Sequence, residues 1–427
     1  MYDLLLIRPN WSGSGVSYPL GLMYVQSYVK SKGYTVKLMD LSYDDMDWSL
    51  IKDNKVKVVG ITMLSRLRES GYELIHKIRS LNEDIKIVIG GVHASSLPEL
   101  IVNNFPVDAA VIGEGEESMG DLMDLWINGY GELEHIPGIA TPEFGIHSQR
   151  ELIHELDRLP FPDMTDINPK NFVPPIMKIK PRFEINGVRL GEATYANMIT
   201  SRGCLGRCKF CNIWKHWEGK VRLRSPKNVV DEIEELNKMG INLIEFNDDS
   251  LAQNRKIMVE ICQEIIDRKL NVAWYSAIRP DLVDKELLEI MHRAGCFMLA
   301  YGVESGSQKI LDNIGKNTKR EDLTEAIKIT KEVGIKAYAL LMIGNLGEDD
   351  RTINETVEFM EETIPDLHSV IGRVWVYPDT EYCEIMEVPE EFWLDGSEMP
   401  FFEKGFTLDD CDRWNTVLNK VPKPWFL

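Results

Sequence analysis

The sequence predicts an α/β protein with two parallel β-sheets, a doubly wound domain followed by a partial barrel. Three observations predict this fold class. Short apolar runs alternate with amphipathic stretches, which is typical of parallel strands covered by helices. The alternation occurs twice, and a proline-rich stretch separates the two series. The 427 residues also exceed the size that one hydrophobic core usually serves.

The first series has five apolar runs, each followed by an amphipathic or polar stretch. The runs lie at 4–7, 36–40, 56–62, 85–91 and 108–113. Continuous apolar strands separated by helices are typical of a sheet that is buried on both faces. Residues 1–130 are therefore expected to form a five-stranded, doubly wound (Rossmann-like) domain.

In a doubly wound sheet, ligands bind at the carboxyl ends of the strands. Neither a G-x-G-x-x-G nor a G-x-x-x-x-G-K-[ST] motif is present, so a dinucleotide or a nucleoside triphosphate is not expected. The candidate binding residues of this rim are Pro9, Asn10, Asp40, Thr62, Leu64, Arg66, Gly90, Gly91, His93, Ser95, Gly113, Glu114 and Gly115.

The second series is longer. Residues 131–190 are rich in proline and lack periodicity, which predicts a connector. Six strands then follow, at 195–200, 241–246, 272–277, 297–304, 336–344 and 370–377. Six βα units over 191–385 predict a partial (β/α)6 barrel, in which chemistry gathers where strands end. Residues 386–427 are expected to form a tail or lid.

Several aromatic residues lie on or beside the predicted barrel strands. Core packing explains most of them, and one or two are expected to line a substrate cavity. These residues are Trp274, Tyr275, Tyr301, Trp375 and Tyr377.

Cys204, Cys208 and Cys211 form a C-x3-C-x2-C motif directly after the first barrel strand. Such a motif is expected by chance in about two per thousand chains of this cysteine content. Three thiols cannot pair evenly in disulfides. Zinc is possible, with His216 as the nearby fourth ligand. A 4Fe-4S cluster fits better, because three thiolates leave one iron without a protein ligand.

The cysteine motif, with Phe210 just before its third cysteine on the loop after the first of six barrel strands, resembles the radical S-adenosylmethionine superfamily. The resemblance implies that the open iron binds S-adenosylmethionine and that one-electron cleavage gives a 5′-deoxyadenosyl radical. The cofactors carry this chemistry, and the protein supplies geometry. The implied S-adenosylmethionine contacts are Asn247, Asp248, Asp249, Ser276, Arg279 and Glu304. For each of them, a solvated strand end or an ion pair of the barrel is the alternative interpretation.

The N-terminal half resembles the cobalamin-binding subfamily of these enzymes through PLGL (19–22), GGVHAS (90–95), GEGEES (113–118) and LDRLPFP (156–162). The resemblance implies that cobalamin binds at the rim described above. The D-x-H-x-x-G motif is absent, so cobalamin is expected to bind without a protein histidine on cobalt. His93 is then expected near the nucleotide tail, and Leu64 and Arg66 under the corrin.

The cysteine count separates this sequence from some relatives. The first cysteine is Cys204, so the N-terminal domain cannot bind the second cluster that tRNA methylthiotransferases require. The four cysteines after the motif need no function as small apolar residues. They are Cys262, Cys296, Cys383 and Cys411.

The resemblance implies a cobalamin-dependent radical S-adenosylmethionine enzyme, with a methyltransferase as the leading interpretation. One S-adenosylmethionine would methylate cobalamin and a second would generate the radical, so that a substrate carbon radical takes the methyl group from methylcobalamin. Two alternatives stay open. One is a non-methylating enzyme that cyclises, rearranges or oxidises its substrate, with or without cobalamin. The other is an iron-sulfur electron carrier or sensor.

Composition limits the partners and the location. The net charge of -20 argues against general nucleic-acid binding. Two basic stretches, 178–190 and 215–224, are read as a solvated hairpin and loop, with a local phosphate site as the alternative. No transmembrane segment or secretion signal is recognised, which predicts a cytoplasmic protein. The expected partners are a small-molecule or lipid-like substrate and an external electron donor such as flavodoxin or ferredoxin.

Overall fold

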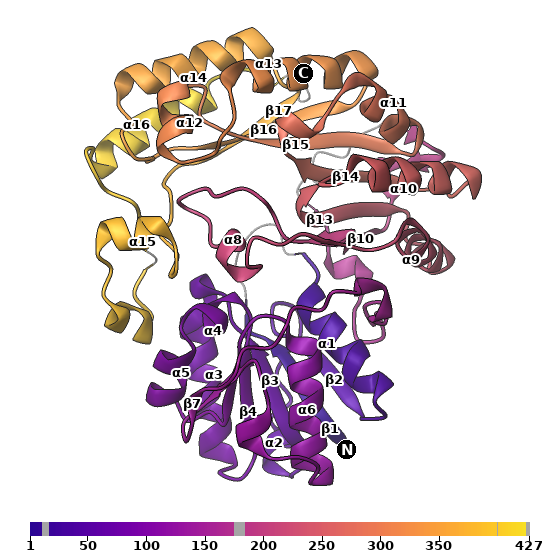
Figure 1. The fold of residues 1–427 in the computed structure, drawn as a ribbon, viewed down its shortest axis with the longest axis vertical. Coiled ribbons are helices and arrows are strands. Elements are labelled where there is room, and N and C mark those ends of the chain that lie inside the picture. Colours follow the sequence, from indigo (N-terminus) through magenta and orange to yellow (C-terminus); the bar gives the residue numbers. More distant parts are fainter. Residues whose placement is uncertain (11–16, 175–183, 399, 424–427) are drawn as a thin grey trace. The chain divides into compact units, whose positions relative to one another are not determined.

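A computed structural model describes residues 1–10, 17–174, 184–398 and 400–423. It has two compact units (Figure 1). Unit 1 comprises Met1–Phe172 and Glu387–Met399, and unit 2 comprises Val173–Met386 and Pro400–Leu427. The predicted division at residues 130, 190 and 385 stays a prediction. None of the helices described is long and apolar enough to cross a membrane.

Unit 1 contains a sheet in the order β2-β1-β3-β4-β5-β6-β7. The first five strands are parallel and close to their predicted positions: β1 (Tyr2–Arg8), β2 (Val36–Asp40), β3 (Val56–Thr62), β4 (Lys86–Gly90) and β5 (Ala109–Val111). All five strands expected within residues 1–130 are present. Two short antiparallel strands, β6 (Ile139–Thr141) and β7 (Gly145–Ile146), extend the sheet. They lie in the proline-rich stretch and are too short to show periodicity.

The helices of unit 1 cover both faces of this sheet. They are α1 (Leu20–Ser31), α2 (Ser49–Lys52), α3 (Arg68–Leu81), α4 (Val92–Ser96), α5 (Pro98–Asn104) and α6 (Gly115–Asn128). The apolar strands form the core, in which Leu5, Val59 and Ile87 are fully buried. The strand order reverses between β1 and β3, which places the expected ligand site at the carboxyl ends of these strands.

Residues 131–172 belong to unit 1 and are joined to α1 and β2 through Asp166. Asp166 accepts hydrogen bonds from Gln26 Nε2 at 2.7 Å, from Lys37 Nζ at 2.6 Å and from the Leu38 amide at 2.9 Å. These contacts fix the part of the proline-rich stretch that follows β6 and β7.

Unit 2 contains an all-parallel sheet in the order β10-β13-β14-β15-β16-β17. The strands are β10 (Tyr195–Met198), β13 (Leu243–Leu251), β14 (Ala273–Ile278), β15 (Cys296–Glu304), β16 (Lys336–Met342) and β17 (Leu367–Ile371). The main helices lie on the outer side of this sheet (Figure 1): α9 (Pro226–Lys238), α10 (Arg255–Asp267), α11 (Lys285–Arg293), α13 (Arg320–Val333) and α14 (Asp350–Thr363). The predicted six-stranded partial barrel is confirmed.

The last predicted strand, 370–377, is wrong in position. β17 ends at Ile371, and the following residues leave the sheet. The Val376 amide donates to Pro400 O at 2.7 Å, and the Phe402 amide donates to Val374 O at 2.8 Å. The apolar run 372–377 therefore pairs with the C-terminal segment, a long-range contact that local sequence does not show.

Short elements complete unit 2. They are α8 (Ile213–His216), α12 (Gln308–Asn313), α15 (Glu381–Met386), α16 (Leu408–Asn419) and the hairpins β8 (Glu184–Ile185) with β9 (Val188–Arg189) and β11 (Ser201–Arg202) with β12 (Arg222–Leu223). The basic stretch 178–190 forms the first hairpin from Glu184 onward, and residues 178–183 lie outside the described part. The stretch 215–224 includes the end of α8 and β12.

Candidate active site

The cysteine loop begins where β10 ends, and Asp248 holds its first residues. One carboxylate oxygen, Oδ1, accepts hydrogen bonds from the Thr200 amide at 2.7 Å and the Ser201 amide at 2.8 Å. The other oxygen accepts from the Thr200 hydroxyl at 2.6 Å. Burial raises the pKa of Asp248 to about 6 despite these bonds. Asp249 accepts from the Gly203 amide at 2.8 Å, so both carboxylates contact the loop.

Cys204, Cys208 and Cys211 are each partly buried on this loop. The Gly206 amide donates to Cys204 Sγ at 3.3 Å. A Cβ atom on Gly206 would lie 3.4 Å from Cys204 Sγ and 3.9 Å from Cys208 Sγ, so glycine leaves the space between these sulfurs free. The described part of the chain holds no group of three cysteines whose sulfurs all lie within 4.8 Å of one another.

Three charged side chains surround the thiols. Burial raises the pKa of Cys208, and it raises that of Cys211 to about 12. The positive charges of Lys316 and Arg279 act in the opposite direction on Cys208. Lys316 Nζ in turn lies 2.8 Å from Glu304 Oε1, and both side chains are nearly buried. These cations favour the thiolate form that a cluster needs.

The structure brings four of the six predicted S-adenosylmethionine contacts to the loop: Asp248, Asp249, Arg279 and Glu304. Glu304 ends β15 with φ at 60°, which is rare outside glycine and turns the chain at this point. Asn247 is exposed on β13. Ser276 is buried, and its hydroxyl donates to Phe246 O at 2.7 Å within the sheet. The roles of all six residues stay predictions.

Two residues at the site escaped the sequence reasoning. Lys316 follows α12 without any motif that marks it. Tyr382 is fully buried on α15, and its amide donates to Lys209 O at 3.1 Å. Its ring lies 6.5 Å from the Phe210 ring and stacks on Phe402 at 4.1 Å. Only the tertiary fold reveals this aromatic support of the cysteine loop.

Side-chain contacts hold two predicted residues in place at the rim of unit 1. Asp40 forms a buried ion pair with Arg8, whose Nη1 also donates to Ser17 O at 2.6 Å. His93 is fully buried, with Nε2 2.9 Å from the Tyr72 hydroxyl and Nδ1 3.0 Å from Ser65 Oγ. Burial lowers the pKa of His93 to about 3, so the ring is neutral. Both ring nitrogens are therefore engaged within unit 1.

The glycines of the rim differ in the space around them. A Cβ on Gly91 would lie 2.8 Å from Met63 O, and φ there is 90°, so only glycine fits without strain. A Cβ on Gly90 or Gly113 would meet no atom within 4 Å. Open space thus lies beside the backbone at the ends of β4 and β5, which fits the close approach of a large ligand.

The remaining predicted rim residues differ in their contacts and burial. Ser95 Oγ accepts from the Gly113 amide at 2.9 Å, and Glu114 accepts from the Ile153 amide at 2.7 Å. Gly115 would place a Cβ 3.2 Å from Val25. The other predicted positions divide into partly or fully buried ones, Pro9, Thr62 and Leu64, and exposed ones, Asn10 and Arg66. Their roles at the rim also stay predictions.

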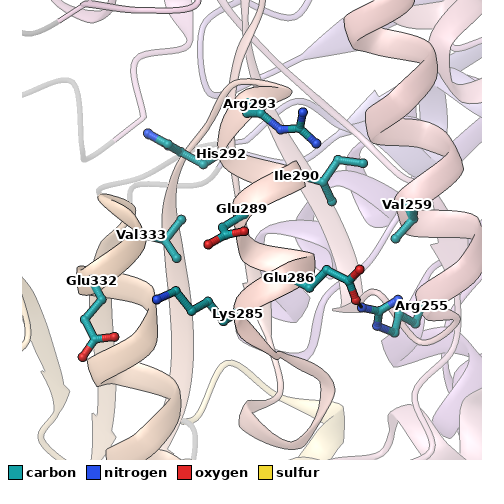
Figure 2. Close-up of a pocket in the computed structure, with 10 residues that line it drawn as sticks. All are labelled: Arg255, Val259, Lys285, Glu286, Glu289, Ile290, His292, Arg293, Glu332 and Val333. Atoms are coloured by element: carbon teal, nitrogen blue, oxygen red, sulfur yellow. Dashed lines mark hydrogen bonds and ion pairs between the residues drawn. The ribbon is translucent and has the colours of Figure 1, made fainter.

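A groove of about 780 Å³ lies between the outer helices α10, α11 and α13 (Figure 2). Charged side chains line most of it, and Glu286 points toward Arg255, with Oε2 2.6 Å from Nη2. It contains none of the predicted site residues. We do not assign the active site to this groove.

Comparisons with known proteins support the family expected for each half of the chain. The family model of the radical SAM superfamily matches residues 198–360, and that of the B12 binding domain matches residues 12–123. An uncharacterized methyltransferase of Pyrococcus horikoshii, PH0819, is 30% identical over 375 residues, which cover 86% of this chain and 78% of that protein. An anaerobic magnesium-protoporphyrin IX monomethyl ester cyclase of Rubrivivax gelatinosus is 29% identical over 398 residues, covering 88% of this chain and 69% of that protein.

Among solved structures, the radical S-adenosylmethionine methyltransferase TsrM from Kitasatospora setae, with cobalamin and a [4Fe-4S] cluster bound, shares the fold. Its TM-score is 0.71 at 21% identity, over 89% of this chain and 74% of that one. The chain therefore belongs to the radical S-adenosylmethionine enzymes with an N-terminal cobalamin-binding domain, and its cofactors are a 4Fe-4S cluster, S-adenosylmethionine and cobalamin.

Proposed function

We propose that this enzyme is a methyltransferase that adds a methyl group to an unactivated carbon of a small molecule. The observation that carries the proposal is the presence of both sites in one chain: three thiols on one loop beside Arg279, and open space at Gly90 and Gly113 on the unit 1 rim. The name of the Pyrococcus relative and the methyltransferase activity of TsrM support it.

When bound, the cofactors supply one-electron cleavage of S-adenosylmethionine and a transferable methyl group. The three cysteines would hold the cluster through their sulfurs. Arg279 and Lys316 stabilise negative charge on those sulfurs, because they lie close to Cys208 in a largely buried setting. Asp248 holds the start of the loop, so that the sulfurs keep their spacing.

At the rim, Asp40 and His93 are held by neighbouring side chains of unit 1, and neither would be a ligand of cobalt. Asp40 is paired with Arg8, and both nitrogens of His93 have partners within unit 1. Gly90 and Gly113 leave room for the cofactor. This arrangement supports cobalamin bound without a protein histidine on the metal.

A non-methylating reaction is the second candidate, because the Rubrivivax relative of similar identity is named a cyclase. Either reaction needs an electron, which we propose comes from an external donor such as flavodoxin or ferredoxin. A small-molecule or lipid-like substrate is part of the same proposal.

The test is anaerobic reconstitution with iron, sulfide and hydroxocobalamin, followed by S-adenosylmethionine and a reductant. Methyl transfer predicts S-adenosylhomocysteine together with 5′-deoxyadenosine, and a change in the optical spectrum of cobalamin. Formation of 5′-deoxyadenosine without S-adenosylhomocysteine would refute the methyltransferase and support the second candidate. Formation of neither product would refute both.

A further inference from the structure

We propose that the inner face of the β10–β17 sheet carries a substrate subsite for a protonated amine, formed by Asn197, Glu245 and Tyr275. The inference rests on the proposed function, because it assumes that unit 2 acts on a small molecule. It names the group by which that molecule is held.

Side-chain contacts identify the inner face. Phe246 and Trp274 pack together, and Trp274 Nε1 donates to Ala294 O at 2.9 Å, which directs them to the helices. Tyr195 and Glu245 belong to the opposite face, where the Tyr195 hydroxyl donates to Glu245 Oε2. Side chains alternate along a strand, so Asn197 shares the face of Tyr195.

Asn197 is the strongest sign of a ligand on this face. It is only 4% exposed, and neither Oδ1 nor Nδ2 has a hydrogen-bond partner in the described structure. A buried amide without partners costs free energy unless something pairs with it. Its strand position is opposite Glu245, so the amide and the carboxylate lie side by side.

Glu245 is a partly buried carboxylate that accepts hydrogen bonds from two phenols. Burial raises its pKa, and hydrogen bonds from Tyr195 and Tyr275 oppose that rise. No positive charge is among the described groups that act on it. A carboxylate has about four acceptor positions, of which the two phenols use two. A cation that donates hydrogen bonds would complete this set.

Small residues line the way from this site to the carboxyl edge of the sheet. Ala277 follows Tyr275 on the inner face and is exposed although β14 is a central strand. It pairs with Ala300 on β15, and Gly302 comes next on that strand. Glu304, beside Cys208, ends the row. A molecule anchored at Glu245 would therefore extend past small side chains toward the cysteine loop.

A protonated amine matches these groups better than an anion or a neutral group. Its N–H donors suit Glu245 and the Asn197 oxygen, and its charge compensates the carboxylate. Tyr275 lies in the subsite, and Tyr338 on β16 is in register with Ala300 on the inner face, so their rings add aromatic surface on the side where the cation would bind.

Calorimetric titration of the reconstituted protein tests the subsite with matched probes, phenethylamine against phenethyl alcohol and butylamine against butanol. At pH 7 we expect at least one amine to bind at least about tenfold more tightly than its alcohol, as a hydrogen bond to a charged group would give. Glu245→Gln keeps the shape and should reduce this ratio to near one. Glu260→Gln, on the outer helix α10, is the matched control and should leave the ratio unchanged.

Asn197→Leu adds a stability measurement. A structural amide would make this variant less stable, whereas an amide kept for a ligand predicts an equal or higher melting temperature together with weaker amine binding. Equal affinity of amines and alcohols, or no measurable binding of any amine, would overturn the subsite. A protein that prefers amines but does not cleave S-adenosylmethionine would instead refute the proposed function alone.

Discussion

Replacing Asp248 by alanine should loosen the start of the cysteine loop, because the two amides of Thr200 and Ser201 lose their acceptor. Asparagine is the matched substitution. Its Oδ1 can accept the same two bonds, now 2.7 and 2.8 Å long, and its amide carries no charge.

The expected loss of stability follows from the two amide N–H groups that are left without an acceptor. Two buried amides without an acceptor cost about 1–2 kcal/mol each, so Asp248→Ala should be less stable than Asp248→Asn by about 2–4 kcal/mol. For a unit of this size, that difference corresponds to a melting temperature lower by roughly 4–16 °C. Calorimetry of the cluster-free protein measures it, and iron per chain after reconstitution should also be lower for alanine.

The free energy of unfolding should depend on pH differently in the wild type and in Asp248→Asn. The pKa of Asp248 is raised by burial from 3.8 to about 6, so the folded state binds more protons than the unfolded state between these values. Wild-type stability should therefore fall as pH rises from about 4 to about 6, by up to about 3 kcal/mol relative to the asparagine variant. Equal stability of the two variants, or the same pH profile for wild type and asparagine, would refute the role given to this carboxylate.

Three further predictions follow from the two units. Cys208→Ser should abolish the visible absorption of the reconstituted cluster, whereas Cys262→Ser, buried in α10, should retain it; equal spectra would contradict the ligand assignment. Because the pKa of His93 is lowered to about 3, unit 1 should lose stability as pH falls from about 6.5 toward 3, and His93→Gln should flatten that loss in thermal unfolding. Trp393→Ala should speed proteolytic cleavage within 387–399, since this buried ring packs on unit 1; unchanged cleavage followed by mass spectrometry would contradict it.

The segment 387–399 shows what local sequence cannot reveal. It was expected in a tail or lid, yet the structure places it in unit 1. The Tyr72 hydroxyl donates to Trp393 O at 2.8 Å, and the Arg68 guanidinium lies 5.5 Å from the Trp393 ring. These contacts join residues more than 300 positions apart, so no periodicity or spacing could have predicted them.

The candidate active site also combines residues that local sequence identifies with contacts that only the tertiary structure shows. The three cysteines are recognisable because their spacing is local and rare. Asp248, Asp249, Arg279 and Glu304 are recognisable because they lie at or near the carboxyl ends of strands of a predictable barrel. Ser276 looked equivalent to them, but its hydroxyl is bound within the sheet. Which side of a strand a residue faces depends on register, and a shift of one residue reverses it.

The sequence by itself determined the two α/β units and the position of the cysteine loop. Both depend on short-range patterns: apolar runs of strand length, amphipathic stretches between them, and three thiols within eight positions. Only the tertiary structure decided which charges surround those thiols, where the last strand ends, and that Asn197 beside Glu245 has no hydrogen-bond partner among the described residues. These features arise from pairing and burial between distant segments, and the free energy of such contacts is set by the folded neighbourhood and not by the local order of residues.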